Sequence, residues 1–412
     1  MGFSAPGAKK DRLFVFFLAF FVFCLNILPA FADNLQESLF PNKTSVRFAK
    51  CFNITYHDTY KKLEVRNPWR GAKEGFVYIL VPQGQDMPKD IPPGAIVVTV
   101  PVKRIALLST TFAAFFPMIG IEKSIVGIGA PDWVHSPEIL ALIKEGHIAK
   151  VGKGQGMGLK FDEERLVTLK PDIVMLYGTG NPATDQHPKL LEGGFKPVIV
   201  APHMEAHPLG RAEWIKFLAA FFNKEAEADR VFNDIVSRYE ALADKVKNIS
   251  YRPTVFCNAP IRGTWHIPGG GGYVAKLIHD AGAKYLWDDD QSTGIITVAI
   301  ETVIERAKNA DFWVGVIMPV QSLEELRAID DRFSLFRAFQ KGNVFNNDVK
   351  VNAAGGNDFW ETGVARPDLV LADFVKIFHP EVLPDQGEHR GSPLLIWYRR
   401  LPPKSDDSGR GH

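Results

Sequence analysis

One stretch of the chain, DEERLVTLKPDIVML at residues 162–176, contains a helix followed directly by a strand. Glu164 opens a helical stretch over 162–169, and Lys170-Pro171-Asp172 leads into the apolar run 173–177, which predicts a buried strand. This pair is the repeating unit of parallel α/β sheets. Residues 301–314, ETVIERAKNADFWV, repeat the order of glutamate, helix, aspartate and strand. The repeat indicates two related halves, with chance similarity between generic helix–strand units as the alternative.

The same alternation of strands and helices extends outward from this stretch. Further strands of a first α/β set are predicted at 95–100, 105–108, 125–128 and 198–201, with helices at 110–118 and 137–144. Residues 46–81 have the composition of an antiparallel edge ribbon, with β-branched and aromatic residues at 52–56 and 76–80. A second α/β set has predicted strands at 253–257, 312–316 and 344–345 and a final helix at 367–378.

A long amphipathic helix at 225–246 separates the two sets, because its apolar residues recur at steps of three and four. At 1.5 Å per residue it would be about 33 Å long, enough to join two domains, although an ordinary packed helix has the same pattern. We therefore predict an α/β fold of two Rossmann-like lobes with mainly parallel central sheets, joined by a single long helix. The predicted parts are an N-terminal lobe with its ribbon at 33–222, the connecting helix at 223–250 and a C-terminal lobe at 251–400.

The first 32 residues have the three parts of a secretory signal. Basic residues within 9–12 precede an apolar run at 13–25, and Ala30 and Ala32 fit a cleavage site. An uncleaved membrane anchor is the alternative, but the run is shorter than the roughly 20 residues that a membrane crossing needs. Lipid attachment at Cys24 is disfavoured because Phe23, not a small residue, precedes it. We expect cleavage near Ala32 and export to the periplasm.

The rest of the composition is that of an ordinary globular protein, with 46% hydrophobic and 23% charged residues and a net charge of +1. This balance does not favour nucleic acid or an anionic membrane surface as a partner. Cys51 and Cys257 lie far apart in apolar stretches and are expected to be buried free thiols, with one disulfide between them left open. Residues 401–412 are expected to form a disordered tail.

The sequence lacks the common catalytic signatures, including the nucleophile elbow, the His-Glu-x-x-His zinc motif and the phosphate loop. The glycine-rich segment 152–158 matches no nucleotide fingerprint and is expected to line a cleft. His203, Glu205 and His207 could hold a divalent ion. Pro208 instead favours a loop before a helix that starts there, with His203 facing a ligand. A metal site of an exported enzyme or of a free-metal-ion binding protein remains the alternative.

Aromatic residues stand beside glycines at four points where strands are expected to end. In open α/β sheets, ligands bind outside the carboxyl ends of the strands, and flat side chains there provide contact area at low entropic cost. Each aromatic residue alone could simply pack against its neighbours. Together they predict a shared ligand-binding cleft with the contacts Trp133, Tyr177, Trp265, His266, Phe359 and Trp360.

The order of several short segments resembles the periplasmic binding proteins for iron–siderophores, haem and cobalamin, whose two lobes are joined by one long helix. No single motif carries the resemblance, which covers 104–202 and 253–380. The matching segments are 104–109, 151–157, 164–174, 208–214, 280–282, 366–380 and Glu301 with the following Ala310-Asp311.

This resemblance implies roles for several residues. Glu164 and Glu301 match the glutamates that dock on arginines of an ABC permease; otherwise they are helix N-terminal acids favoured by the dipole. Gln155 joins the ligand contacts. Gly154 stands where cobalamin receptors have a tryptophan, which weakens cobalamin as the ligand. The resemblance therefore implies a periplasmic receptor that captures a metal chelate. It would be a monomer without catalytic activity or a cofactor of its own, working with the permease subunits.

Overall fold

The computed structural model describes residues 1–3, 38–153, 160–316, 319–383 and 394–404. The chain divides into a unit of Met1–Pro41 and a compact unit of Asn42–His412, and the second contains both sheets predicted above. The predicted signal segment with its cleavage site near Ala32, and the loop with Gly154 and Gln155, lie outside the described residues. Within the described ranges, no helix combines the length and the hydropathy that a membrane crossing requires.

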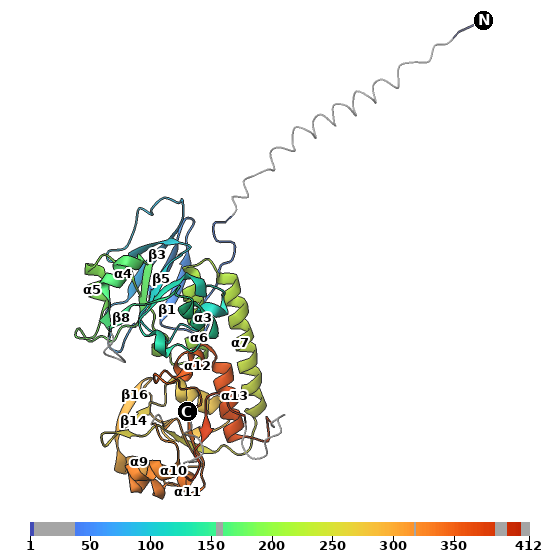
Figure 1. Ribbon diagram of the computed structural model, residues 1–412. Helices are drawn as coiled ribbons and strands as arrows, with labels where there is room; N and C mark the ends of the chain where they lie inside the picture. The colour runs from blue at the N-terminus through green and yellow to red at the C-terminus, as the bar shows by residue number, and fades with distance from the viewer. Residues whose placement is uncertain (4–37, 154–159, 317–318, 384–393, 405–412) are drawn as a thin grey trace. The chain divides into compact units, whose positions relative to one another are not determined.

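The N-terminal lobe is built on a five-stranded parallel sheet in the order β11-β10-β5-β6-β7 (Figure 1). Its central strands are buried along their whole length, as the uninterrupted apolar runs of the sequence predict. The predicted helix at 110–118 is shorter in the structure, because 111–114 form turns. The elements are β5 Ile105–Leu107, α2 Phe115–Met118, β6 Ile125–Ile128, α3 Pro137–Lys144, β7 Ala149–Lys150, α4 Glu163–Leu169, β10 Ile173–Leu176, α5 His187–Glu192 and β11 Pro197–Ile199.

The predicted ribbon is a separate four-stranded sheet in the order β1-β2-β3-β4. Its strands are β1 Phe52–Tyr56, β2 Lys61–Val65, β3 Phe76–Pro82 and β4 Ile96–Val100. The first three pair antiparallel, as predicted, but β3 and β4 are parallel. The sequence assigned β4 to the α/β set, and this assignment is wrong. A loop rather than a helix joins β3 to β4, and an apolar run alone does not tell which sheet it enters. A two-stranded pair, β8 Gly152–Lys153 and β9 Lys160–Phe161, completes the lobe.

The ribbon is held on the lobe by buried charged groups. The Nζ atom of Lys61 lies 2.6 Å from a carboxylate oxygen of Glu225, and both side chains are almost completely buried. The Glu213 carboxylate, also buried, accepts hydrogen bonds from the backbone N–H groups of residues 47–49. Buried charges are retained only when they are paired or hydrogen-bonded in this way.

The C-terminal lobe contains a five-stranded sheet in the order β15-β12-β17-β18-β19, parallel except for its last strand. A three-stranded antiparallel sheet in the order β13-β14-β16 is formed by residues that come between β12 and β17 in the sequence. The strands are β12 Thr254–Cys257, β13 Pro260–Ile261, β14 Thr264–Pro268, β15 Lys284–Tyr285, β16 Ile295–Ala299, β17 Phe312–Val314, β18 Val344–Asn346 and β19 Arg399–Arg400. The helices are α8 Tyr273–Asp280, α9 Ile300–Ala307, α10 Leu323–Ile329, α11 Arg337–Gln340, α12 Thr362–Ala365 and α13 Pro367–Phe378.

Residues 401–403 were expected to belong to a disordered tail, and the structure corrects this. The N–H of Leu401 donates to the carbonyl of Val344, which extends the pairing at the sheet edge. The carbonyls of Pro402 and Pro403 accept the N–H groups of residues 323 and 324, at the start of α10, where helical N–H groups lack internal partners. Residues 405–412 lie outside the description.

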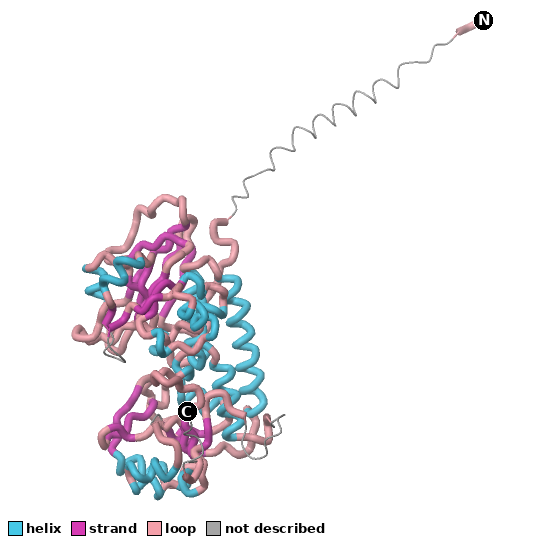
Figure 2. The backbone as a smooth tube through the Cα atoms, viewed as in Figure 1, coloured by secondary structure: helices cyan, strands magenta, loops and turns pink. Residues whose placement is uncertain are grey.

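Two long helices lie between the sheets in the chain, α6 Pro208–Ala220 and α7 Glu225–Val246. α7 has the bounds that the sequence predicts and packs against α6 of the N-terminal lobe and α13 of the C-terminal lobe (Figure 1, Figure 2). Cys51 and Cys257 are buried free thiols, as expected.

The repeated aspartates hold equivalent positions in the two lobes. Asp172, before β10, accepts the N–H groups of residues 103 and 104 at 2.9 Å and donates its own N–H to the carbonyl of Arg104. Asp311, before β17, makes the same exchange with Thr254, accepting at 2.8 Å and donating at 3.0 Å. In both lobes the aspartate therefore holds the chain that enters the neighbouring strand, β5 or β12, in register.

Candidate functional site

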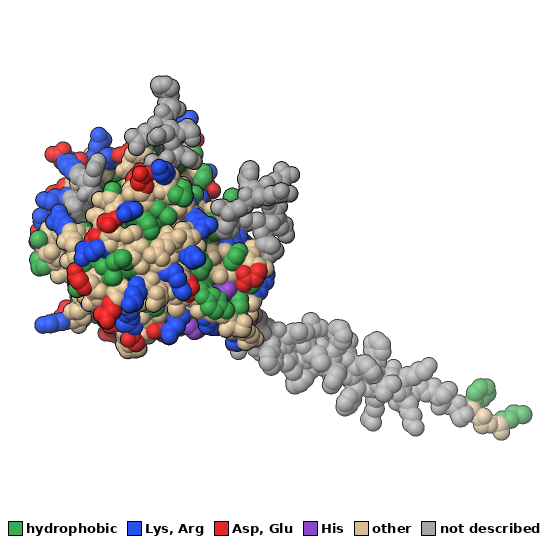
Figure 3. Space-filling model, turned by 90° about the horizontal axis from the view of Figure 1, so that it is seen from below, with side chains coloured by type: hydrophobic (Ala, Val, Ile, Leu, Met, Phe, Trp, Pro, Cys, Tyr) green, Lys and Arg blue, Asp and Glu red, His purple; other side chains and the backbone are tan. Residues whose placement is uncertain are grey.

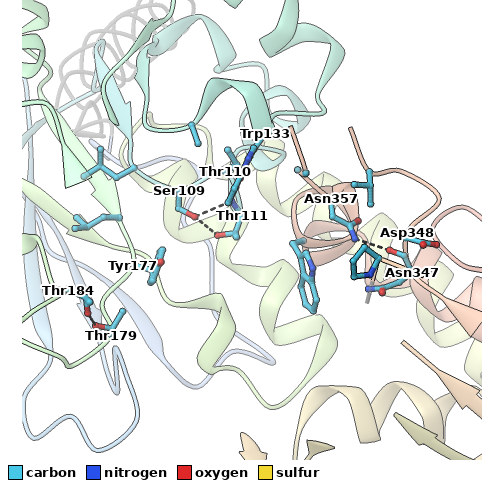
Figure 4. A pocket seen from close by; sticks show the side chains of 18 of the residues that line it. Ser109, Thr110, Thr111, Trp133, Tyr177, Thr179, Thr184, Asn347, Asp348 and Asn357 are labelled. Atoms are coloured by element: carbon cyan, nitrogen blue, oxygen red, sulfur yellow. Dashed lines mark hydrogen bonds between the residues drawn. The ribbon is translucent and has the colours of Figure 1, made fainter. Parts of the chain in front are cut away.

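A cavity of about 830 Å³ lies between loops of the N-terminal and C-terminal lobes. Its size falls in the range of small-molecule sites, which are mostly apolar with a few polar groups at defined positions. Here the polar side chains form a large part of the wall (Figure 4). The lining residues include Leu108, Ser109, Thr110, Thr111, Trp133, Tyr177, Thr179, Thr184, Gln321, Asn346, Asn347, Asp348, Asn357 and Trp360.

The N-terminal wall is made of hydroxyl groups that follow two adjacent parallel strands. Ser109, Thr110 and Thr111 come directly after β5, and Tyr177 and Thr179 come directly after β10. Because β5 and β10 pair in parallel, their carboxyl ends meet at one edge, where ligands bind in such sheets. The Ser109 and Thr111 hydroxyls are 2.9 Å apart and form one hydrogen bond. The wall is therefore polar and uncharged.

The C-terminal wall is made of carboxamides at the end of β18 and in the loop after it. Asn346 and Asn347 are almost completely buried, and Asp348 follows them. Asn357 donates from its side chain to the carbonyl of Asn347 at 2.9 Å, so it fixes the loop after the strand. The Asp348 carboxylate binds the guanidinium of Arg399 through two hydrogen bonds of 2.7 Å. Its charge is thus compensated within the lobe.

Direct hydrogen bonds join the two lobes beside the cavity. The indole Nε1–H of Trp133 donates to the carbonyl of Ala354 at 3.0 Å, and the Asn352 side chain donates to the carbonyl of Asp132 at 2.9 Å. A Cβ atom at Gly356 would lie 2.6 Å from the backbone of Trp133, so only glycine fits this approach. The lobes are therefore in close contact through this segment as well as along α7.

Glu361 completes this contact between the lobes. Its carboxylate accepts the N–H groups of His135 at 3.0 Å and Ser136 at 3.1 Å, next to the start of α3. The side chain is buried, and burial raises its pKa from an ordinary value of 4.5 to about 7. The nearby Asp358 raises this pKa further, and the two backbone N–H groups oppose the shift.

Three of the predicted ligand contacts line the cavity. Trp133 and Tyr177 belong to the N-terminal wall, and Trp360 to the C-terminal side, where 37% of its surface is exposed. Gln155 lies outside the described residues. Burial and the charge of Asp185 raise the pKa of the Tyr177 phenol, so it stays neutral.

The other predicted contacts do not line the cavity. Trp265 is completely buried in the core of the C-terminal lobe, and its Nε1–H donates to the carbonyl of Cys257 at 3.0 Å. Phe359 packs under Trp360 against Trp397 and Tyr398. His266 follows Trp265 on β14, outside the lining. Sequence reasoning took the aromatic residues near glycines as ligand contacts in a cleft, but the lobe uses Trp265 and Phe359 to build its core.

The histidine segment forms no metal site in the structure. The Glu205 carboxylate is occupied by the N–H groups of Lys50 and Cys51 and by the indole of Trp214. The His207 ring accepts the N–H of residue 209 as the N-cap of α6, which begins at Pro208 as predicted. His203 contacts the Tyr177 ring edge-on but does not line the cavity. No group of three metal-ligating side chains occurs anywhere in the described ranges.

Glu164 and Glu301 lie in the first turns of α4 and α9 and are exposed. The Glu301 carboxylate is 3.1 Å from the guanidinium of Arg332. Figure 3 shows the face of the molecule seen from below, where acidic and basic side chains are interspersed. Both positions are open to a partner, as docking requires, and also suit the helix dipole.

The hydroxyl and carboxamide residues of the walls were missed by sequence reasoning. A signal was available, because residues 109–111 follow a predicted strand and residues 346–348 follow another. The carboxyl-end rule applied to these residues as much as to the aromatic ones. Short polar side chains after a strand are common in loops, so their type alone did not mark them.

Comparison with known proteins adds evidence on the fold and the family. A family model described as "Periplasmic binding protein" matches residues 105–350. An uncharacterized lipoprotein of Methanocaldococcus jannaschii is 28% identical over 366 residues, which cover 84% of this chain and 84% of the relative.

Solved structures share the fold at low sequence identity. A possible iron-binding periplasmic solute-binding protein from Staphylococcus epidermidis superimposes with a TM-score of 0.52 and 16% identity, covering 68% of this chain and 99% of the other. An Fe3+-hydroxamate transport protein from Saccharomonospora viridis has a TM-score of 0.51 and 17% identity, covering 68% and 94%.

Proposed function

Because the chain belongs to the periplasmic binding protein family, a family of binding proteins rather than enzymes, we propose that it is the exported receptor of an ABC importer. In this proposal it captures a metal chelate, of the iron–siderophore or cobalamin type, and delivers it to the permease. The observation that carries the proposal is the cavity of about 830 Å³, which is lined by loops of both lobes at the carboxyl ends of strands. Two proteins of the same fold, a possible iron-binding protein and an Fe3+-hydroxamate transport protein, support the ligand class.

Ligand capture is tested by titrating the tryptophan fluorescence of the purified protein with ferric siderophores, haem, cobalamin and free metal ions. Trp133 and Trp360 line the cavity, so binding of a chelate should quench their emission. Trp360→Ala should weaken binding about tenfold or more, since aromatic contacts in a binding site are worth on the order of 1 to 2 kcal/mol. Tyr251→Ala, at an exposed aromatic residue outside the cavity, is the matched control and should bind normally. Binding of free metal ions alone would overturn the proposal.

Delivery to a permease is tested with the two glutamates. The double variant with Glu164→Ala and Glu301→Ala should keep its ligand affinity and lose transport, because both side chains lie outside the cavity. Glu163 and Glu305 are exposed on the same helices, and their double alanine variant is the control. Uptake that is equal in both double variants would remove the docking assignment.

Export is the remaining part of the proposal, and the lipoprotein name of the relative supports it. We propose that the signal segment is removed near Ala32. The mass of the protein recovered from the native host tests this directly. A chain that retains residues 1–32, or one that begins at a lipid-modified Cys24, would contradict this cleavage.

A further inference from the structure

The walls of the cavity carry no net positive charge. The described lining residues include no Lys, Arg or His, and Asp348 is the only acid among them. Arg399 binds both oxygens of that carboxylate, so the acid has its own counter-charge within the C-terminal lobe. A negatively charged ligand would therefore enter the cavity without a cationic partner.

Uncharged hydrogen-bonding groups face the cavity from both lobes (Figure 4). Asn347 is only 3% exposed, yet its carboxamide forms no hydrogen bond within the described part of the chain. On the opposite wall the hydroxyls of Thr110 and Tyr177 likewise have no side-chain hydrogen bond to a described residue. Neither polar atom of this carboxamide is enclosed without a partner, so it is accessible from the cavity and can form a hydrogen bond to a molecule bound there.

From these walls we infer that the ligand is an electrically neutral chelate whose surface presents carbonyl, amide or hydroxyl groups. The inference rests on the proposed function and narrows its substrate class. Moving an uncompensated charge out of water has a large desolvation cost, whereas neutral groups lose only hydrogen bonds to water that the walls replace.

The candidate chelates differ in their net charge. Three hydroxamate anions cancel the charge of a ferric ion, and cyanocobalamin is also neutral. Three catecholate dianions leave a ferric complex strongly negative, and haem carries two propionates. The raised pKa of Tyr177 is consistent with this choice, because a neutral phenol is a hydrogen-bond partner rather than a phenolate ligand of a bare metal ion.

The test titrates the whole protein with ferrichrome, cyanocobalamin, ferric enterobactin and haem at low and high ionic strength. One of the two neutral chelates should bind at least tenfold more tightly than either anionic one, and its affinity should change less than about twofold with salt. Whichever of the two neutral chelates binds more tightly shows whether the ligand is of the hydroxamate or the cobalamin type. Tighter binding of ferric enterobactin or haem would overturn this inference and leave the proposed function standing. Failure of all four to bind would overturn both.

Substitutions of Asn347 and Gln321 test whether the residues of the cavity walls set the preference for a neutral chelate. Asn347→Ala should weaken binding of the neutral chelate up to about tenfold, since one hydrogen bond is lost. Its unfolding temperature should not change, because the side chain bonds to no described residue. Gln321→Arg places a cation on the exposed rim and should raise the affinity for ferric enterobactin, whereas Gln321→Glu, the matched control, should lower it. Unchanged affinity in Asn347→Ala would contradict the assignment.

Discussion

Buried charged groups hold the ribbon on the N-terminal lobe, whereas aromatic rings pack around the strands of the C-terminal lobe. In the first, Lys61 pairs with Glu225, and the Glu205 and Glu213 carboxylates hold the segment 47–51 through its N–H groups. In the second, a contiguous cluster of rings packs around β12, β14 and β17. Its members are Phe256, Trp265, Trp313, Phe333 and Phe336.

Tryptophan has different roles at different places in the molecule. Trp133 of the N-terminal lobe lines the cavity, whereas Trp214 of the same lobe is completely buried against Phe52 and Phe217. Trp265 of the C-terminal lobe is taken up by the aromatic core and is lost to the ligand. A tryptophan beside glycines in the sequence therefore does not by itself distinguish a cavity residue from a core residue.

The largest expected effect comes from Trp265→Ala in the aromatic core. Removal of a completely buried indole should lower the free energy of unfolding by about 3 to 5 kcal/mol, through lost contacts and the cavity left behind. Trp133→Ala is the matched control and should weaken ligand binding at a stability cost below about 1 kcal/mol. Urea denaturation and fluorescence titration measure both. A Trp265→Ala protein of normal stability with impaired binding would reverse the comparison.

Lys61→Met tests the buried charges of the N-terminal lobe. It leaves the Glu225 carboxylate buried without its cation, and the loss should be about 3 kcal/mol of unfolding free energy. Lys62→Met, at the partly exposed ion pair with Glu64 on the same strand, should cost less than about 1 kcal/mol. If both variants lose the same free energy of unfolding in chemical denaturation, burial of the Lys61–Glu225 pair makes no added contribution to stability.

Glu361 links the two lobes and predicts a pH dependence. Its pKa is raised to about 7, so between pH 4.5 and 7 the native protein holds a proton that the unfolded chain has released. Its contribution to the free energy of unfolding should therefore fall by about 2 to 3 kcal/mol as the pH rises through this window. Glu361→Gln is always neutral and should remove that decline. Parallel stability curves of the two proteins from pH 4.5 to 7.5 would contradict the assignment.

The smallest effects concern the paired aspartates. Asp311→Ala should cost about 1 to 2 kcal/mol, because it loses the N–H and hydroxyl of Thr254 at a partly buried site. Asp172→Ala should cost about 1 kcal/mol or less, since its two hydrogen bonds are exposed. Thermal unfolding compares the two variants. A larger loss at Asp172 would mean that the lobes do not use the repeated aspartate in the same way.

The secondary structure could be predicted from the sequence where a periodic pattern is complete within one segment. α7 and α13 have the predicted bounds, because their apolar faces repeat over several turns. The assignment of β4 failed because pairing is a relation between strands, and its partner β3 lies beyond an irregular loop. The site could be predicted only in part. Tyr177 directly follows β10, a strand that the sequence predicts, so its place was predictable. Asn357 belongs to the wall through its hydrogen bond to the carbonyl of residue 347, which the sequence does not show.

Local patterns in the sequence were sufficient for the two α/β sets, the long helix between them and the glutamate–aspartate repeat, since each depends on neighbours within one or two elements. The chemistry of the cavity depends on contacts between residues more than 200 positions apart, such as Trp133 with Ala354 and Ser136 with Glu361. Folding alone determines that Trp265 enters the core, that Arg399 neutralises Asp348 and that the Asn347 carboxamide lines the cavity without a side-chain hydrogen bond to a described residue. Burial and charge compensation are properties of the packed chain, and a sequence carries them only through the fold that it specifies.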